Sequence, residues 1–187
     1  MRVFLGIPIT QDVVSKIANV QKRLSSFDIK FVEKENLHFN LKFFRHIEEE
    51  KIDQMKEIVK QTCEKFEKFD INISGLDAFP SKNYIRVIWL GVKDGYNELV
   101  ALTNMIEDGL EPLGFEKEKQ KFIPHLTLGR VRSGRNKEKM KETVKELENI
   151  EIGTMKLDRV VLFQSKLGPE GPVYEEVFSI ELSTPSG

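Results

Sequence analysis

Cysteine is the scarcest reactive side chain in this sequence. The 187 residues contain a single cysteine, Cys63, so no disulfide can form within the chain. Cys63 stands in the helical pattern "IVKQTCEKF" with no partner nearby, and we interpret it as a structural residue. Chains without disulfides are typical of reducing compartments, so we expect a cytoplasmic protein.

Long apolar runs are also absent. The first ten residues, "MRVFLGIPIT", contain an apolar run far shorter than the roughly 20 residues that a transmembrane helix needs. They lack the charged start and the cleavage pattern of a secretory signal, and they are typical of an opening strand. No later segment approaches the length of a membrane span, so we expect a soluble protein with no membrane partner.

The chain has little net charge, −1 at pH 7 with a pI of about 6.4, which excludes a chain that binds polyanions over its whole surface. The charges are nevertheless uneven, because residues 130–141 hold six basic residues against one acid. Such a run is usually a solvated face, but its position directly after a histidine stretch makes attraction of phosphate the alternative. The basic residues are Arg130, Arg132, Arg135, Lys137, Lys139 and Lys141.

No Gly/Ser-rich or low-complexity stretch marks a domain border, so we expect residues 1–187 to form one domain made of two lobes. Predicted strands occur in neighbouring pairs as well as between helices, which favours an α+β fold with antiparallel sheets over a doubly wound parallel one. The patterns predict strands at 2–9, 28–33, 36–44, 69–80, 84–92, 121–131, 151–163 and 173–182, and helices at 10–24, 48–69, 95–113 and 136–150.

Histidine is nearly as scarce as cysteine, with three in the chain. One of them lies in "ENLHFNLKFFR", residues 35–45, which has the alternating pattern of a strand. Side chains two apart in a strand point to the same face, so His38, Asn40 and Lys42 are expected on one face. The other face is then apolar, formed by Leu37, Phe39, Leu41 and Phe43.

A second histidine lies in a stretch of the same shape, "FIPHLTLGRVR", residues 122–132. Alternation places His125 and Thr127 on one face and Leu126 and Leu128 on the other. Both stretches therefore bury apolar side chains and present a histidine with a short hydrogen-bonding residue two positions later. The third histidine, His46, precedes an acidic helix start and is interpreted as a surface residue.

Either stretch alone is best explained as a strand that contains a hydrogen-bonded histidine. Together they indicate more, because His38 and His125 are 87 residues apart, close to half of the chain, and each is flanked by helices. Two similar lobes related by a pseudo-twofold axis would bring these strands together. We therefore predict that the two histidines form one active site.

The chemistry of such a pair is limited by what surrounds it. Two imidazoles without a nearby acid or cysteine form a weak zinc site, so we expect no metal and no other cofactor. No G-x-S-x-G motif is present, and Cys63 is helical, so covalent catalysis lacks a nucleophile. Two opposed imidazoles suit metal-free acid–base catalysis, in which a neutral one takes a proton from water and a charged one gives a proton to a leaving oxygen. The Thr127 hydroxyl, the Asn40 amide and a basic residue can hold phosphoryl oxygens.

The two stretches resemble the paired H-x-[ST]-L motifs of the 2H phosphoesterase superfamily. More narrowly, the chain is similar to the RNA 2′,3′-cyclic phosphodiesterases that were historically called 2′-5′ RNA ligases. The likeness extends nearly from end to end and includes "RVFLGIPI", "FVEKENLHFNLKFF", "YIRVIWLGV", "GFEKEKQKFIPHLTLGRVR" and "LFQSKLGPEGPVYEEV". One motif alone is weak, whereas both at this spacing are specific.

The resemblance implies a bilobal α+β fold in which two pseudo-twofold-related antiparallel sheets, with flanking helices, surround a central cleft. It implies metal-free hydrolysis of RNA 2′,3′-cyclic phosphate ends to 2′-phosphates, with His38 as general acid and His125 as general base. Arg130 matches an arginine that the family places near the phosphate. Alternation turns Arg130 away from His125, so reaching the cleft requires a bulge at Gly129 or the end of the strand there.

One residue departs from the family pattern, because Asn40 stands where Thr or Ser is usual. Its amide can donate a hydrogen bond to phosphate, so we expect activity to survive with an altered rate or preference. Two alternatives stay open: ATP-independent 2′-5′ ligation at the same site, and a non-catalytic module that binds RNA ends. The expected partner is RNA with a 2′,3′-cyclic phosphate end, such as a tRNA fragment, or a cyclic nucleotide, and the expected state is a monomer.

Overall fold

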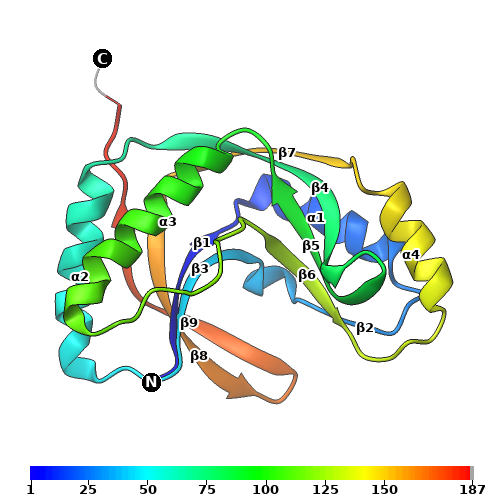
Figure 1. Ribbon diagram of the computed structural model, residues 1–187, viewed down its shortest axis with the longest axis horizontal. Helices are drawn as coiled ribbons and strands as arrows, with labels where there is room; N and C mark the ends of the chain where they lie inside the picture. Colours follow the sequence, from blue (N-terminus) through cyan, green and yellow to red (C-terminus); the bar gives the residue numbers. More distant parts are fainter. Residues whose placement is uncertain (186–187) are drawn as a thin grey trace.

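An antiparallel sheet flanked by helices forms the frame of the protein in its computed structural model, which describes residues 1–185 (Figure 1). The strands are β1 (Val3–Pro8), β2 (Ile29–Phe31), β3 (His38–Phe44), β4 (Phe69–Ser81), β5 (Tyr84–Val92), β6 (Leu126–Val131), β7 (Glu151–Leu157), β8 (Arg159–Gly168) and β9 (Gly171–Glu181). The helices are α1 (Gln11–Arg23), α2 (Glu49–Glu64), α3 (Tyr96–Leu110) and α4 (Lys137–Glu146), with short 3-10 turns at Lys34–Asn36 and Glu111–Leu113.

The sheet consists of two halves that meet in its middle. One half has the order β7-β4-β5-β6 and the other β3-β1-β8-β9, and every strand pair along this path is antiparallel. The two halves join at one residue pair, Phe39 with Leu126, which are both fully buried. The α+β fold with two antiparallel halves is as expected, and the junction makes them one continuous hydrogen-bonded path.

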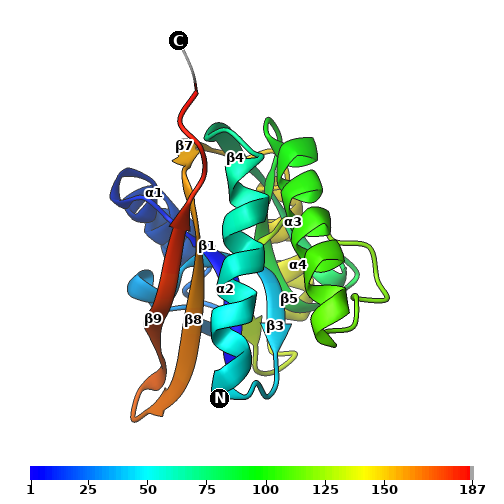
Figure 2. The same cartoon turned by 90° about the vertical axis from the view of Figure 1, so that its left-hand side faces the viewer.

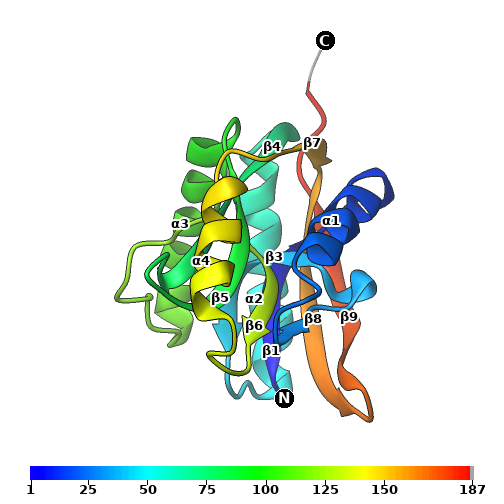
Figure 3. The ribbon, with the colours of Figure 1, turned by 90° about the vertical axis from the view of Figure 1, so that its right-hand side faces the viewer.

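The helices cover the two halves at opposite ends of the molecule. Helices α2 and α3 lie side by side, and α2 also packs on β8 and β9 (Figures 1 and 2). At the other end, α4 packs against β4 and α1 against β7 (Figure 3). Each helix buries an apolar stripe with helical spacing, as in α2, where Met55, Val59 and Cys63 are fully buried. No helix within residues 1–185 is long and apolar enough to cross a membrane.

Both central strands contain a bulge at the same distance from their histidine. In β3, the register with β1 skips Leu41, and in β6 the register with β5 skips Leu128. Each of these leucines stands three residues after a histidine, and each is buried. A bulge adds one residue to one strand and therefore reverses the face on which the following side chains lie.

The histidines stand at the starts of their strands and not in the middle. His38 is the first residue of β3, and His125 directly precedes β6. The predicted strand at 121–131 is therefore too long at its beginning, because Pro124 has no N–H to donate to a neighbouring strand. The predicted strand at 151–163 is likewise two strands, β7 and β8, which are separated at Asp158.

Candidate active site

Four polar side chains meet on one face of the sheet at the junction of its halves. Because Phe39 pairs with Leu126, continuing this antiparallel register by one residue sets His38 opposite Thr127 and Asn40 opposite His125. The two histidines are thus diagonal neighbours across the strand pair, a relation in which residues are about 7–8 Å apart and their Cβ atoms somewhat closer. The structure brings these four predicted site residues together.

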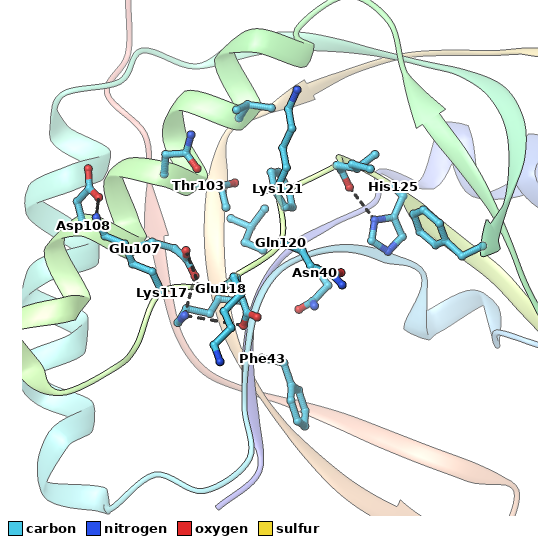
Figure 4. Close-up of a pocket in the computed structure, with 18 of the residues that line it drawn as sticks. Asn40, Phe43, Thr103, Glu107, Asp108, Lys117, Glu118, Gln120, Lys121 and His125 are labelled. Carbon is cyan, nitrogen blue, oxygen red and sulfur yellow. Dashed lines mark hydrogen bonds and ion pairs between the residues drawn. The ribbon is translucent and has the colours of Figure 1, made fainter. Parts of the chain in front are cut away.

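The same backbone hydrogen bond orients both imidazoles. The Nδ1 atom of His38 lies 2.7 Å from the carbonyl oxygen of Asn36. The Nδ1 atom of His125 lies 2.7 Å from the carbonyl oxygen of Ile123 (Figure 4). A carbonyl oxygen can only accept, so each Nδ1 carries a hydrogen and donates it. Nε2 is then the nitrogen of each ring that can take up or release a proton, and both rings are held in the same tautomer.

Aromatic side chains surround His38. Its ring lies 4.6 Å from that of Phe4 and 5.5 Å from that of Tyr174, which meets it edge-on, and Phe163 lies 6.4 Å away. Gly6 lies beside it in β1, where an added Cβ would come within 2.9 Å of the Phe39 carbonyl and 3.3 Å of the His38 ring. The absence of a side chain at Gly6 therefore leaves the room that this imidazole occupies.

His125 has aromatic neighbours from the other half of the sheet. Its ring meets that of Phe79 edge-on at 5.1 Å and that of Trp89 at 5.7 Å, and these two aromatic rings stack on each other at 4.6 Å. Sequence patterns did not identify these residues or Tyr174 as part of the site. The available signals were that Trp89 is the only tryptophan of the chain and that Tyr174 lies in the segment "GPVYEEV".

These surroundings lower the pKa of both histidines. Burial has the largest effect on His38 and lowers its pKa, the Asn36 carbonyl opposes this, and the charge of His125 lowers it further. Burial likewise lowers the pKa of His125, the Ile123 carbonyl opposes it, and the Arg130 guanidinium lowers it further. The charge of His125 therefore disfavours a second charge on His38.

The bulge in β6 places Arg130 on the face of the histidines. Strand β5 pairs Trp89 with Thr127 and Val87 with Arg130, so the bulge at Leu128 puts Arg130 on the same face as Thr127. The guanidinium is close enough to add to the lowering of the pKa of His125, and it opposes the rise that burial causes in the pKa of Tyr174. A bulge is the condition under which Arg130 was expected to reach the cleft, and it occurs one residue before Gly129.

The bulge in β3 overturns part of the predicted alternation. Lys42 was expected beside His38 and Asn40, but its side chain is 4% exposed and points into the protein. Its Nζ lies 2.6 Å from a carboxylate oxygen of Glu107 on α3 and 2.7 Å from the carbonyl oxygen of Glu116. Phe43, which was expected in the core, is 38% exposed instead.

A cleft of about 1320 Å³ extends from His125 and Asn40. Figure 4 shows Asn40 and His125 at one end and Glu107 near the other, with Gln120 and Lys121 between them. Its walls are β3, α3 and residues 117–123. Of the basic run at 130–141, Arg130 influences His125, whereas no residue of that run lines the cleft as the structure describes it.

The other two residues considered from the sequence lie outside this site. His46 is exposed, as predicted for a surface residue. Cys63 is fully buried in α2, and burial raises the pKa of its thiol to about 12, as fits a structural residue. Over residues 1–185, no three His, Cys, Asp or Glu side chains gather in an arrangement that could hold a metal ion.

Comparison with known proteins decides the family. The sequence model of the 2′-5′ RNA ligase superfamily matches residues 6–169. The chain belongs to this superfamily. It is 38% identical to the RNA 2′,3′-cyclic phosphodiesterase of Methanothermobacter thermautotrophicus over 95% of this chain and 96% of that protein. It is also 38% identical to the enzyme of the same name from Methanocaldococcus jannaschii, over 95% and 98% of the two chains.

Solved structures share the fold of this chain. A protein from Thermus thermophilus superposes with a TM-score of 0.84 at 21% identity and covers 100% of both chains. Escherichia coli LigT, in a crystal structure with 3′-AMP, superposes with a TM-score of 0.77 at 20% identity over 98% of both chains. The overall arrangement of helices and strands is thus common to this chain and these proteins.

Proposed function

We propose that this chain hydrolyses the 2′,3′-cyclic phosphate at RNA ends to a 2′-phosphate and a free 3′-hydroxyl by metal-free acid–base catalysis. The observation that supports it best is the pair of imidazoles on one diagonal, each with Nδ1–H bonded to a backbone carbonyl and Nε2 left for proton transfer. The relatives from Methanothermobacter thermautotrophicus and Methanocaldococcus jannaschii carry the name of this activity, and both align along nearly their whole length.

In this mechanism His125 acts as the base. Its Nε2 takes a proton from a water molecule while the water oxygen attacks phosphorus, and the bond from phosphorus to the 3′ oxygen breaks. His38 donates the proton on its Nε2 to the departing 3′ oxygen, so that the product is a 2′-phosphate with a 3′-hydroxyl. One histidine has then gained a proton and the other has lost one, and exchange with solvent restores both.

The assignment of roles depends on how a bound phosphate changes these charges. Burial lowers the pKa of both histidines, the charge of Arg130 lowers that of His125 further and the charge of His125 that of His38, so both imidazoles tend to be neutral in the free protein. A bound anionic phosphate favours a protonated His38, which is the form that an acid needs. The Thr127 hydroxyl, the Asn40 amide and the Arg130 guanidinium are proposed to hold the phosphoryl oxygens as charge develops on them.

The test is product analysis on 2′,3′-cyclic nucleotides with a chelator present. We expect 2′-nucleotides from the wild type, and a loss of turnover of about 10²- to 10⁴-fold in His38→Ala or His125→Ala, as is usual for a general acid or base. His46→Ala is the matched control, because it removes the third histidine, which is exposed. Turnover near the wild-type rate in either active-site variant would refute the two-histidine mechanism.

Two other activities are compatible with the same residues. Run in reverse, the pair would join a cyclic phosphate end to a 5′-hydroxyl as a 2′-5′ linkage, which is the activity that gave the superfamily its name. Adding an RNA with a 5′-hydroxyl and measuring the yields of joined and hydrolysed product separates the two directions. Tight binding of cyclic-ended RNA, such as a tRNA fragment, that is returned unchanged would instead indicate a binding module.

A further inference from the structure

Phe43 is an exposed aromatic side chain in the wall of the cleft. It is 38% exposed although it lies in a central strand whose apolar neighbours are buried. The bulge at Leu41 turns it to the face of His38, and it stands opposite Phe4, whose ring contacts His38. The guanidinium of Arg2 lies 5.5 Å from the centre of the Phe43 ring.

The position of Phe43 corresponds to that of Arg130 in the other half of the sheet. Each stands five residues after its histidine and two after the bulged leucine. Phe43 lies about 10 Å along β3 from Asn40, at the usual rise of a strand. At that distance, and with no group that could bind phosphate, the Phe43 ring meets another part of a bound RNA.

The cleft beside Phe43 is long and carries free positive charge. Small-molecule pockets are about 300–1,000 Å³, whereas this cleft is about 1320 Å³. Arg45, Lys119 and Lys121 line it, and none of them forms an ion pair within residues 1–185. An exposed aromatic ring among unpaired cations is what a single-stranded RNA requires, because bases stack on the ring and phosphates meet the cations.

The wall opposite Phe43 is held in place by a buried ion pair. Lys42 joins β3 to α3 through Glu107, and its Nζ also binds the carbonyl oxygen of Glu116. The other carboxylate oxygen of Glu107 accepts the backbone N–H of Glu118 at 3.2 Å. The segment that carries Lys119 and Lys121 is therefore fixed to the strand of Phe43, so the two walls of the cleft keep their positions relative to each other.

We propose that Phe43 is the stacking platform for the base of a nucleotide on the 5′ side of the cyclic phosphate. The preferred substrate is then an RNA strand and not a cyclic mononucleotide. This inference rests on the proposed function and names its substrate class. Stacking on an aromatic ring accepts every base, so the subsite recognises a strand without reading its sequence.

The test compares a 2′,3′-cyclic mononucleotide with a trinucleotide that has the same cyclic end. Phe43→Leu is expected to lower the kcat/KM of the trinucleotide relative to that of the mononucleotide at least fivefold, since stacking of one base contributes this much or more. Phe43→Trp is expected to retain the wild-type ratio. Tyr84→Leu is the matched control, because Tyr84 is 59% exposed with Arg86 5.4 Å from its ring centre and does not line this cleft.

A ratio unchanged in Phe43→Leu, or lowered equally in Tyr84→Leu, would overturn the platform. A binding measurement with a 3′-phosphorylated trinucleotide, which needs no chemistry, separates this inference from the proposed function. Suppose that neither the wild type nor Phe43→Leu hydrolyses cyclic ends, but Phe43→Leu binds this RNA at least fivefold more weakly than the wild type. The proposed function then fails and the stacking platform stands. Equal binding by wild type and Phe43→Leu refutes the platform whatever the outcome for hydrolysis.

Discussion

Strands β3 and β6 have the same backbone design at the centre of the sheet, yet the five residues after their histidines, "FNLKF" and "LTLGR", share only the leucine. Both histidines bond to the carbonyl two residues earlier, and both strands bulge at that leucine. The backbone thus repeats what holds an imidazole in position. The side chains differ where the proposed reaction needs different things, an arginine on one side and an exposed aromatic ring on the other.

The largest effect is expected from removing both histidines. If His38 and His125 act as one unit, the double variant His38→Ala/His125→Ala loses about as much turnover as either single variant, within the 10²- to 10⁴-fold range of acid–base catalysis. Single-turnover rates on a cyclic trinucleotide measure this. A double loss equal to the product of the single losses would show that the two residues act independently.

The two strands also differ four residues after the histidine, where β3 has Lys42 and β6 has Gly129. Breaking the ion pair of Lys42 tests what this difference contributes to stability. Lys42→Ala leaves the Glu107 carboxylate, which is 12% exposed, without its partner. Removal of one member of a buried pair typically costs about 3–5 kcal/mol, and we expect the free energy of unfolding to fall by that amount. Urea denaturation measures it. The control is Lys156→Ala, which removes an exposed partner of Asp70, and its expected cost is about 0–1 kcal/mol.

Five residues after the histidine, β6 has Arg130 where β3 has Phe43. Substitutions of Arg130 test whether this arginine contributes to catalysis. Arg130→Ala is expected to lower kcat/KM for cyclic nucleotides about 10- to 100-fold, in line with the ~1.5–3 kcal/mol of a hydrogen bond to a charged group. Arg130→Lys keeps the charge and should recover part of the loss. An unchanged kcat/KM in Arg130→Ala would mean that the guanidinium lies on the face of the histidines without contacting substrate.

The pH dependence tests the assignment of base to His125. Both pKa values are lowered, so the form with one neutral and one protonated imidazole is most populated below pH 6.5, and kcat/KM of the free enzyme falls as pH rises above neutrality. Removing Arg130 removes a charge that lowers the pKa of His125. The acidic limb of the profile, set by the base, should therefore move to higher pH in Arg130→Ala. A shift of the basic limb alone would show that His125 is the acid and His38 the base.

The smallest effect is expected at Asn40, two residues after His38. The Oδ1 atom of Asn40 is buried and has no hydrogen-bond partner among the described residues. Asn40→Thr removes this unpaired oxygen and matches Thr127, so we expect kcat to be retained or raised and the free energy of unfolding to rise by about 1 kcal/mol. Initial rates and urea denaturation of both proteins measure this. A lower kcat would show that the amide has a role of its own.

The fold class and the histidine pair were predictable because their signals are local. Alternating leucines around His38 and His125 indicate two strands, and the neighbouring strand pairs indicate an antiparallel fold. The exposure of Phe43 and the burial of Lys42 were not predictable, because alternation holds only until a bulge. Tyr174 was missed since it comes from β9, far along the chain from either motif.

The sequence by itself determined which residues are available for the proposed reaction, two histidines each followed two positions later by a short polar residue. It also determined which side chains are apolar enough to form the core. The tertiary structure decided how they meet. The pairing of Phe39 with Leu126 sets the diagonal of imidazoles, and the bulges at Leu41 and Leu128 select the face of Phe43 and Arg130. Register and bulges arise from hydrogen bonds between strands that are distant in the chain, so no local pattern of residues encodes them.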